Sequence, residues 1–205
     1  MKVIGITGGI GAGKSAVLEY WEQHLGAKLL QTDQIAKKMM LPNTDCMRRI
    51  QELFPPNVVT ADGELIPEQM AELIFQNECY RKKLNEIVHP EVKKYVRQEV
   101  EMEKLRHRYS TVIIESALLI EEHYDEICDE MWYIYTSEEN RKKRLQQSRG
   151  YSEEKIKDIF ASQLTDMEFR EKCPKIIDNN GTLDETYRQI EKLRKSKGEY
   201  RNGVK

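Results

Sequence analysis

The chain has 205 residues, which suits one domain with inserted subdomains rather than two independent domains. Its 33 Lys and Arg residues nearly balance its 35 Asp and Glu residues, so no overall charge favours nucleic acid or an anionic membrane as a partner, and a phosphorylated small molecule fits better. No apolar run approaches the roughly 18 residues that span a bilayer, so we expect a soluble protein with no membrane partner.

Residues 3–17 combine a buried strand, a glycine-rich loop and the start of a helix. Gly8, four further residues and then Gly13-Lys14-Ser15 match the phosphate-binding loop, and both flanks have the structure that this pattern requires. The glycines permit backbone N–H groups to turn inward, and the bound anion then lies at the positive end of the helix. A glycine-rich turn that binds nothing would not need Lys-Ser before an amphipathic helix.

Lys14 supplies a mobile cation for the β- and γ-phosphates of a nucleotide. The Ser15 hydroxyl is placed to bind a magnesium ion that bridges the same phosphate oxygens. The loop therefore predicts a nucleoside triphosphate site with Mg²⁺ as the cofactor.

Asp33 follows the second predicted strand, residues 27–30, which comes after a helix of about three turns. Open α/β folds bind their ligands at this carboxyl edge of the sheet, so Asp33 is a candidate catalytic carboxylate. Asp33 also precedes a helical pattern over residues 35–40, and a role as helix N-cap is equally compatible with its position.

Residues 44–88 have helical patterns, interrupted by turn signals, and no good strand candidate. We interpret this segment as a helical insertion, well placed to hold the acceptor of a phosphotransfer enzyme. His89 alone is compatible with a structural or a functional role, and Pro90 is expected to begin the next helix in its first turn. The charges of the helix over residues 91–108 are interpreted as a solvated face.

Residues 111–115 form a β-branched run that ends on a carboxylate. The pattern predicts a third strand whose Glu115 lies beside the magnesium ion, directly or through water, with an ordinary acid at a strand end as the alternative. Residues 131–135 and 175–178 predict the fourth and fifth strands. Five strands separated by helices predict a parallel, three-layer α/β/α architecture.

Residues 138–151 predict a basic helix that runs to Gly150, and residues 152–154 predict the cap and first turn of another helix. We expect the two helices to form a hinged flap whose arginines close over the phosphates and exclude water. RNA binding is the competing interpretation, but only one short stretch is basic and no aromatic platform lies beside it. The tail from Lys195 is expected to fray.

The expected location of the protein is the cytoplasm. The first apolar run enters the glycine-rich loop with no basic leader, so we expect no secretory signal. The four cysteines are far apart in the sequence and form no C-x-x-C pair, which argues against a zinc or redox site and favours reduced thiols.

In this combination of motifs the sequence resembles the dephospho-coenzyme A kinase family over nearly its whole length. The residues that carry the resemblance are 7–15, Asp33, Asp62-Gly63, 84–90, Leu118-Leu119-Ile120-Glu121, Arg144-Leu145, Arg149, Gln163 and 177–181. The resemblance implies transfer of the ATP γ-phosphoryl group to the ribose 3′-hydroxyl of dephospho-CoA, the last step of coenzyme A synthesis. Its small-molecule partners would be ATP and dephospho-CoA, without nucleic acid, in a monomer or weak homo-oligomer.

The resemblance also implies an organisation and a set of site residues. The P-loop kinase core would comprise residues of about 1–35, 90–136 and 170–205, the acceptor insertion about 36–89 and the lid about 137–169. The expected ATP-binding residues are Gly8, Gly9, Gly11, Ala12, Gly13, Lys14, Ser15, Ala16, Arg144, Arg149 and Asn180. Asp33, His89 and Leu118 would bind the acceptor; Asp33, Lys14 and Arg149 would act in catalysis; Ser15 and Glu115 would bind Mg²⁺.

Five positions depart from the family pattern: Ala16, Pro67, Glu115, Ala117 and Pro174. Pro67 matters most, because it replaces a common arginine of the acceptor domain. The loss of that positive charge is expected to weaken or alter acceptor binding. A kinase of another small acceptor, such as a nucleoside monophosphate, is therefore the first alternative. A P-loop nucleotide switch is the second, but the chain has no Asn-Lys-x-Asp signature.

Overall fold

The computed structural model of the chain describes residues 1–195, so most of the tail predicted to fray lies outside the described residues. A five-stranded sheet forms its centre, with strands β1 (Lys2–Thr7), β2 (Lys28–Gln31), β3 (Thr111–Glu115), β4 (Glu130–Tyr135) and β5 (Lys175–Asp178). All paired strands are parallel, in the order β2-β3-β1-β4-β5. The predicted fold class is confirmed, and the strands lie where the sequence predicts them, with ends shifted by one residue at most.

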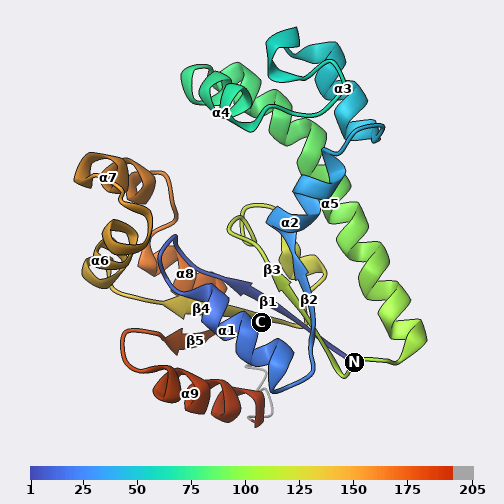
Figure 1. The fold of residues 1–205 in the computed structure, drawn as a ribbon. Coiled ribbons are helices and arrows are strands. Elements are labelled where there is room, and N and C mark those ends of the chain that lie inside the picture. The colour runs from blue at the N-terminus through green and yellow to red at the C-terminus, as the bar shows by residue number, and fades with distance from the viewer. Residues whose placement is uncertain (196–205) are drawn as a thin grey trace, which may run out of the picture.

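The strands are apolar because helices cover both faces of the sheet. On one face, Ile4 and Ile6 of β1 pack with α1 (Lys14–Gln23) and α9 (Leu183–Lys195), and the rings of Trp21 and Trp132 meet edge to face at 5.6 Å. On the other face, Val3 joins a larger core built against α5 (Glu78–Arg106). Figure 1 shows α1 and α9 side by side on one face.

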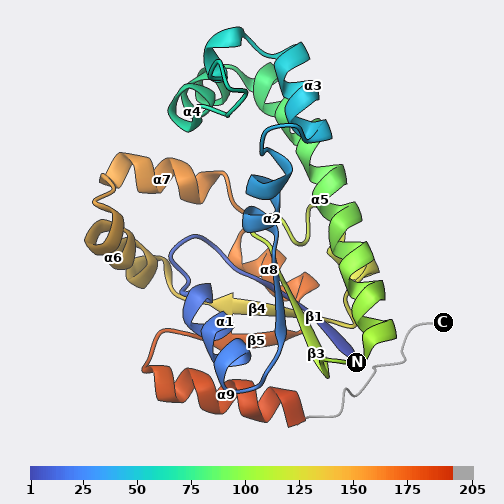
Figure 2. The ribbon, with the colours of Figure 1, turned by 45° about the vertical axis from the view of Figure 1, so that its right-hand side comes forward.

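The predicted helical insertion is built on the 29-residue helix α5. Helices α2 (Thr32–Met39), α3 (Asp45–Leu53) and α4 (Pro67–Gln76) pack against α5. Two short 3₁₀ helices lie in connecting segments, η1 (Pro56–Val58) between α3 and α4 and η2 (Tyr124–Glu126) between β3 and β4. Figures 1 and 2 show that α3 and α4 lie at the end of α5 that projects away from the sheet. No helix among the described residues is long and apolar enough to cross a bilayer.

Pro90 does not begin a helix as predicted, because it lies in the interior of α5. Proline removes one intrahelical hydrogen bond and usually interrupts a helix, so this placement needs compensation. The compensation comes from an apolar stripe, which buries Ile87, Val88, Val92 and Val96 on both sides of the proline. The helix begins twelve residues earlier, where Asn77 Oδ1 accepts a hydrogen bond from the Cys79 N–H at 2.9 Å.

Two predicted helices form the flap, α6 (Glu138–Arg149) and α7 (Glu153–Ala161). They are joined at Gly150, whose φ of 62° ends α6, and the Ser152 side chain accepts a hydrogen bond from the Lys155 N–H at the start of α7. A third helix, α8 (Asp166–Lys172), was not predicted. Its Phe169 ring stacks on Tyr133 of β4 at 4.6 Å, so α8 packs against the sheet.

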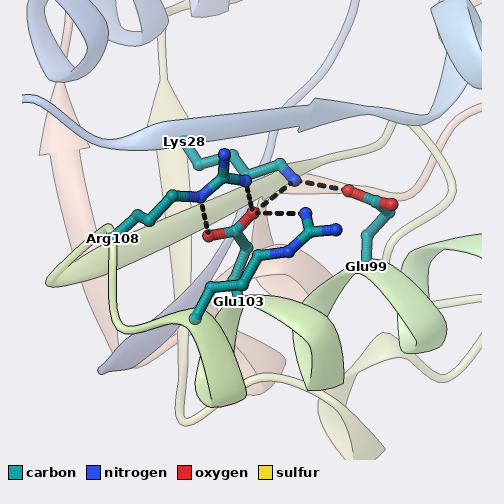
Figure 3. A network of polar contacts seen from close by, with 5 residues as sticks. Lys28, Glu99, Glu103 and Arg108 are labelled. Atoms are coloured by element: carbon teal, nitrogen blue, oxygen red, sulfur yellow. Dashed lines mark hydrogen bonds and ion pairs between the residues drawn. The ribbon is translucent and has the colours of Figure 1, made fainter.

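The expectation that the charges of α5 form only a solvated face is wrong for Glu103, whose side chain is fully buried. Its carboxylate pairs with Lys28 Nζ of β2 at 3.1 Å and with the Arg108 guanidinium, and Lys28 also pairs with Glu99 (Figure 3). Hydrogen bonds from Arg108 and Lys28 outweigh burial and lower the pKa of the Glu103 carboxyl to about 2. This network fastens the end of α5 to edge strand β2.

Replacing Glu103 by Gln should lower the unfolding midpoint at neutral pH, because Lys28 and Arg108 lose their buried counter-charge. A carboxyl whose pKa falls from 4.5 to about 2 on folding stabilises the protein above pH 4.5 and loses that contribution as the pH falls toward 2. The difference in denaturant midpoint between wild type and Glu103→Gln should therefore narrow over this pH range. Glu101→Gln, which removes an exposed partner of Lys104, is the control, and equal midpoints for both variants at pH 7 would contradict the account.

Candidate active site

The glycine-rich loop connects β1 to α1 and exposes the first turn of that helix. Gly8, Gly11 and Gly13 adopt positive φ angles of 155°, 79° and 84°. A Cβ atom at Gly8 would lie 2.6 Å from the Ile134 carbonyl oxygen, so the backbone itself excludes a side chain there. Gly13 occupies the N-cap position of α1 and has no side chain to cap it, which leaves the first N–H groups free for an anion.

Lys14 and Glu115 form a partly buried pair at the end of this loop. Lys14 Nζ donates to the Gly8 carbonyl at 2.9 Å and lies 3.7 Å from Glu115 Oε1. Burial lowers the pKa of the Lys14 ammonium and raises the pKa of the Glu115 carboxyl, and the attraction between the two charges opposes both shifts. The pair thus holds a cation in a weakly solvated position, where a phosphate would interact with it strongly.

A cleft of about 580 Å³ runs along the loop. It brings together most residues predicted for the donor nucleotide and the metal: Gly11, Ala12, Gly13, Lys14, Ser15, Glu115, Arg144 and Arg149. The predicted residues Gly8, Gly9, Ala16 and Asn180 lie outside its lining. Its volume is in the range of typical nucleotide-sized pockets.

The Ser15 hydroxyl and Glu115 carboxylate offer oxygen donors of the type that Mg²⁺ prefers. Within residues 1–195 no group of three or more His, Cys, Asp or Glu side chains is arranged to hold a metal by itself. Mg²⁺ usually binds through one or two protein groups plus substrate phosphates and water, so these two residues fit such a site.

Asp33 lies in the first turn of α2, and Gln31 is the N-cap of that helix, so the alternative role of Asp33 as N-cap is wrong. Asp33 lines the cleft and also a second cavity of about 80 Å³. His89 and Leu118, the other two predicted acceptor residues, line the same second cavity. All three are therefore brought together, although they come from separate parts of the chain. A ligand of nucleoside size would extend beyond a cavity of this volume.

Arg144 connects the loop to the end of β5, and Asn180 connects the end of β5 to the start of α6. The Arg144 guanidinium donates to the Asn179 carbonyl at 2.7 Å and to the Ala12 carbonyl at 3.3 Å. Asn180 Oδ1 accepts hydrogen bonds from the Ser137 N–H and from Asn140 Nδ2, both at 2.9 Å. Arg149 has no such contact with the loop; it lies at the last turn of α6, with its guanidinium 5.9 Å from the centre of the Tyr151 ring.

Arg141 is a site residue that the sequence analysis missed. Its buried guanidinium donates to the Ile10 carbonyl at 2.8 Å and to Gln163 Oε1 at 2.5 Å, and it lies 4.2 Å from the centre of the Phe160 ring. Gln163 Oε1 also accepts the Ile10 N–H at 3.2 Å, so Arg141 of α6 and Gln163, just after α7, hold the tip of the loop. The available signal was its spacing, because a residue three positions before Arg144 lies on the same helical face.

Comparisons with known proteins agree with this geometry. A family model described as dephospho-CoA kinase matches residues 2–185. The dephospho-CoA kinase of Shouchella clausii is 33% identical over a match that covers 91% of this chain and 94% of the relative's own length. The dephospho-CoA kinase of Geobacillus kaustophilus is also 33% identical, over a match that covers 91% of this chain and 92% of its own length. Among solved structures, TT1252 from Thermus thermophilus has a TM-score of 0.78 at 27% identity and covers 96% of this chain and 98% of its own.

Two further structures are similar in fold. Dephospho-CoA kinase from Campylobacter jejuni has a TM-score of 0.69 at 24% identity, and the match covers 95% of this chain and 96% of that one. Shikimate kinase from Acinetobacter baumannii has a TM-score of 0.52 at 17% identity, and the match covers 95% of this chain and 93% of that one. They place the sheet and its loop among P-loop kinase folds.

Replacing Arg141 by Gln should weaken ATP binding about tenfold, because the loop tip loses a charge-assisted hydrogen bond worth roughly 1.4 kcal/mol. Isothermal titration calorimetry with ATP measures this change directly. Lys143→Gln on the same helix, which loses only an exposed pair with Glu139, should bind ATP as the wild type does. Equal dissociation constants for Arg141→Gln and the wild type would show that the contact does not hold the loop.

Proposed function

The chain belongs to the dephospho-CoA kinase family, and we propose that its two cavities divide the reaction, the cleft taking ATP and the second cavity the reacting end of dephospho-CoA. The family phosphorylates dephospho-CoA with ATP in the final step of coenzyme A biosynthesis. The observation that carries the proposal is the position of Asp33, which lines both cavities. A carboxylate at that junction is where a hydroxyl acceptor must meet the γ-phosphorus.

The donor half uses the loop and its buried cation. The N–H groups at the start of α1 and the Lys14 ammonium bind the β- and γ-phosphates, and Lys14 exchanges its Gly8 and Glu115 contacts for phosphate oxygens. Ser15 and Glu115 would hold Mg²⁺, which when bound would neutralise charge on the same phosphates. The longer side chain of Glu115, compared with aspartate, allows binding directly or through water.

The acceptor half is centred on Asp33, which accepts the proton of the ribose 3′-hydroxyl as transfer proceeds. Asp33 also orients that hydroxyl in line with the γ-phosphorus. This positioning matters because in phosphoryl transfer the protein acts mainly by positioning the reactants and stabilising charge, and forms no covalent bond to them. His89 and Leu118 form other parts of the same cavity wall. The 80 Å³ volume admits only the reacting end of the substrate, and the rest extends along the helical insertion.

Residues of about 137–169 act as the lid, residues of about 36–89 as the acceptor insertion, and the remainder as the core. Because α5 continues unbroken from the insertion into the core, we expect the insertion to move with the sheet and the lid to supply the closing motion. Gly150 provides the hinge, and Arg149 beside it neutralises charge at the transferring phosphoryl group.

The remaining expectations concern partners and location. Cys128 and Cys173 are protonated at neutral pH, because burial raises the pKa of each thiol to about 12, and such thiols suit a reducing cytoplasm. We infer a cytoplasmic monomer or weak homo-oligomer whose partners are its two substrates and which does not bind nucleic acid.

Asp33→Asn should retain ATP binding and lower kcat by about 10²- to 10⁴-fold, because it removes the proton acceptor and keeps the side chain's shape. Coupled ADP release with dephospho-CoA measures turnover, and calorimetry measures ATP binding. A variant that turns over normally would exclude Asp33 from the reaction.

Arg149→Ala should reduce kcat about tenfold or more while changing ATP affinity of the free enzyme little, because the arginine contributes mainly after lid closure. Lys157→Ala, an exposed change on α7, is the matched control for altered lid charge. An unchanged kcat in Arg149→Ala, or an equal loss in both variants, would argue against this role.

A further inference from the structure

We propose that Glu122 is a positioning residue that fixes the tautomer of His89, so that His89 Nε2 accepts a hydrogen bond from the ribose hydroxyl next to the reacting one. The inference rests on the proposed function of the second cavity as the acceptor site. His89 and Glu122 both line that cavity, together with Asp33. They are 33 residues apart in sequence and meet only in the folded chain.

The contact between the two side chains determines where the imidazole proton lies. His89 Nδ1 and Glu122 Oε1 are 2.7 Å apart, and both side chains are about one third exposed or less. An ionised carboxylate only accepts hydrogen bonds, so Nδ1 must carry the proton. In the neutral ring Nε2 then carries a lone pair, and no residue among 1–195 forms a hydrogen bond with it.

Glu122 is itself held in place by backbone contacts. Lys93 Nζ donates to the Glu122 carbonyl at 2.7 Å, and the Glu122 N–H donates to the Leu118 carbonyl at 2.9 Å. Lys93 lies one helical turn after His89 on α5. This helix therefore contacts both the backbone carbonyl and the side chain of Glu122. Lys93 is also 3.4 Å from Glu126. These contacts keep the carboxylate beside Nδ1.

A lone pair at Nε2 discriminates between kinds of ligand. An ionised phosphate oxygen has no proton to donate, whereas a sugar hydroxyl does. Thr32, Ser116, Glu122 and Tyr124 also line the cavity, and Asp33 is the residue of its wall that also lines the cleft. A cavity of about 80 Å³ keeps Asp33 and His89, both acceptors, within reach of one sugar. Two acceptors match the two neighbouring hydroxyls of a ribose, with the 3′-hydroxyl at Asp33 and the 2′-hydroxyl at His89. The pair therefore selects a ribose over a 2′-deoxyribose.

The kinetic test compares dephospho-CoA with its 2′-deoxyribose analogue. Glu122→Ala should lower kcat/KM for dephospho-CoA about 5- to 10-fold and leave the KM for ATP unchanged, as expected for loss of one hydrogen bond. The same variant should lose the wild type's preference for dephospho-CoA over the analogue. Glu122→Gln should retain most activity, because its amide oxygen still accepts the Nδ1 proton. Asp125→Ala, an exposed change three residues away, should behave as wild type.

A double-variant cycle separates positioning from general structural support. Because Glu122 acts through His89, the double variant His89→Ala/Glu122→Ala should be no less active than His89→Ala alone. Additive losses, or an equal loss with both substrates, would overturn the proposal.

Nitrogen-15 NMR of the imidazole gives a readout that does not depend on activity. In the wild type the neutral His89 ring should carry its proton on Nδ1, and in Glu122→Ala it should shift toward the Nε2-protonated form; exposed His107 serves as the internal reference. A wild-type ring protonated on Nε2 would overturn the proposal even in a fully active enzyme. An Nδ1-protonated ring in an enzyme that does not phosphorylate dephospho-CoA would instead overturn the proposed acceptor.

Discussion

The arrangement of β2, β3 and β1 as parallel neighbours is the constraint from which the site follows. Their register aligns Gln31 with Glu115 and Glu115 with Ile6, so the three carboxyl ends lie at one edge of the sheet. Asp33 lies just beyond the first end, Glu115 at the second and the glycine-rich loop just beyond the third. Any phosphate bound by the loop is thereby placed beside two carboxylates, the candidate metal ligand Glu115 and the candidate base Asp33.

A second set of contacts ties the helical insertion to the same edge. The buried Glu103 of α5 pairs with Lys28 of β2, and β2 leads directly into the turn that carries Asp33. The opposite half of α5 carries His89, so this helix connects two of the predicted acceptor residues, Asp33 and His89, through the sheet. At the loop, Arg141 has a corresponding role, because it connects α6 to the tip of the loop. Buried charged groups with specific partners thus fix α5 and α6 relative to the sheet and its glycine-rich loop.

Local pattern was sufficient to predict the loop, the five strands, the flap helices and the candidate residues at strand ends. It was insufficient wherever tertiary contact decides the outcome. The apolar stripe carries α5 through Pro90 against local propensity, and Glu103 is buried only because Lys28 and Arg108 meet it. His89 could not be given a role from its neighbours in sequence, because its partner Glu122 comes from another segment. The hydrogen bonds of Arg141 to the loop are likewise invisible until the chain folds.

The most direct test of the central claim is to identify the phosphorylated product. The enzyme is incubated with ATP, Mg²⁺ and, in parallel, dephospho-CoA, 4′-phosphopantetheine or a nucleoside monophosphate, with ADP release followed by a coupled assay and the product examined by phosphorus-31 NMR. The structure predicts that dephospho-CoA stimulates ADP release far more than the other acceptors and that the new phosphate lies on the ribose 3′-oxygen. Preferred phosphorylation of a nucleoside monophosphate, or a phosphate at the 2′-oxygen, would contradict the assignment of Asp33 and the second cavity to the acceptor.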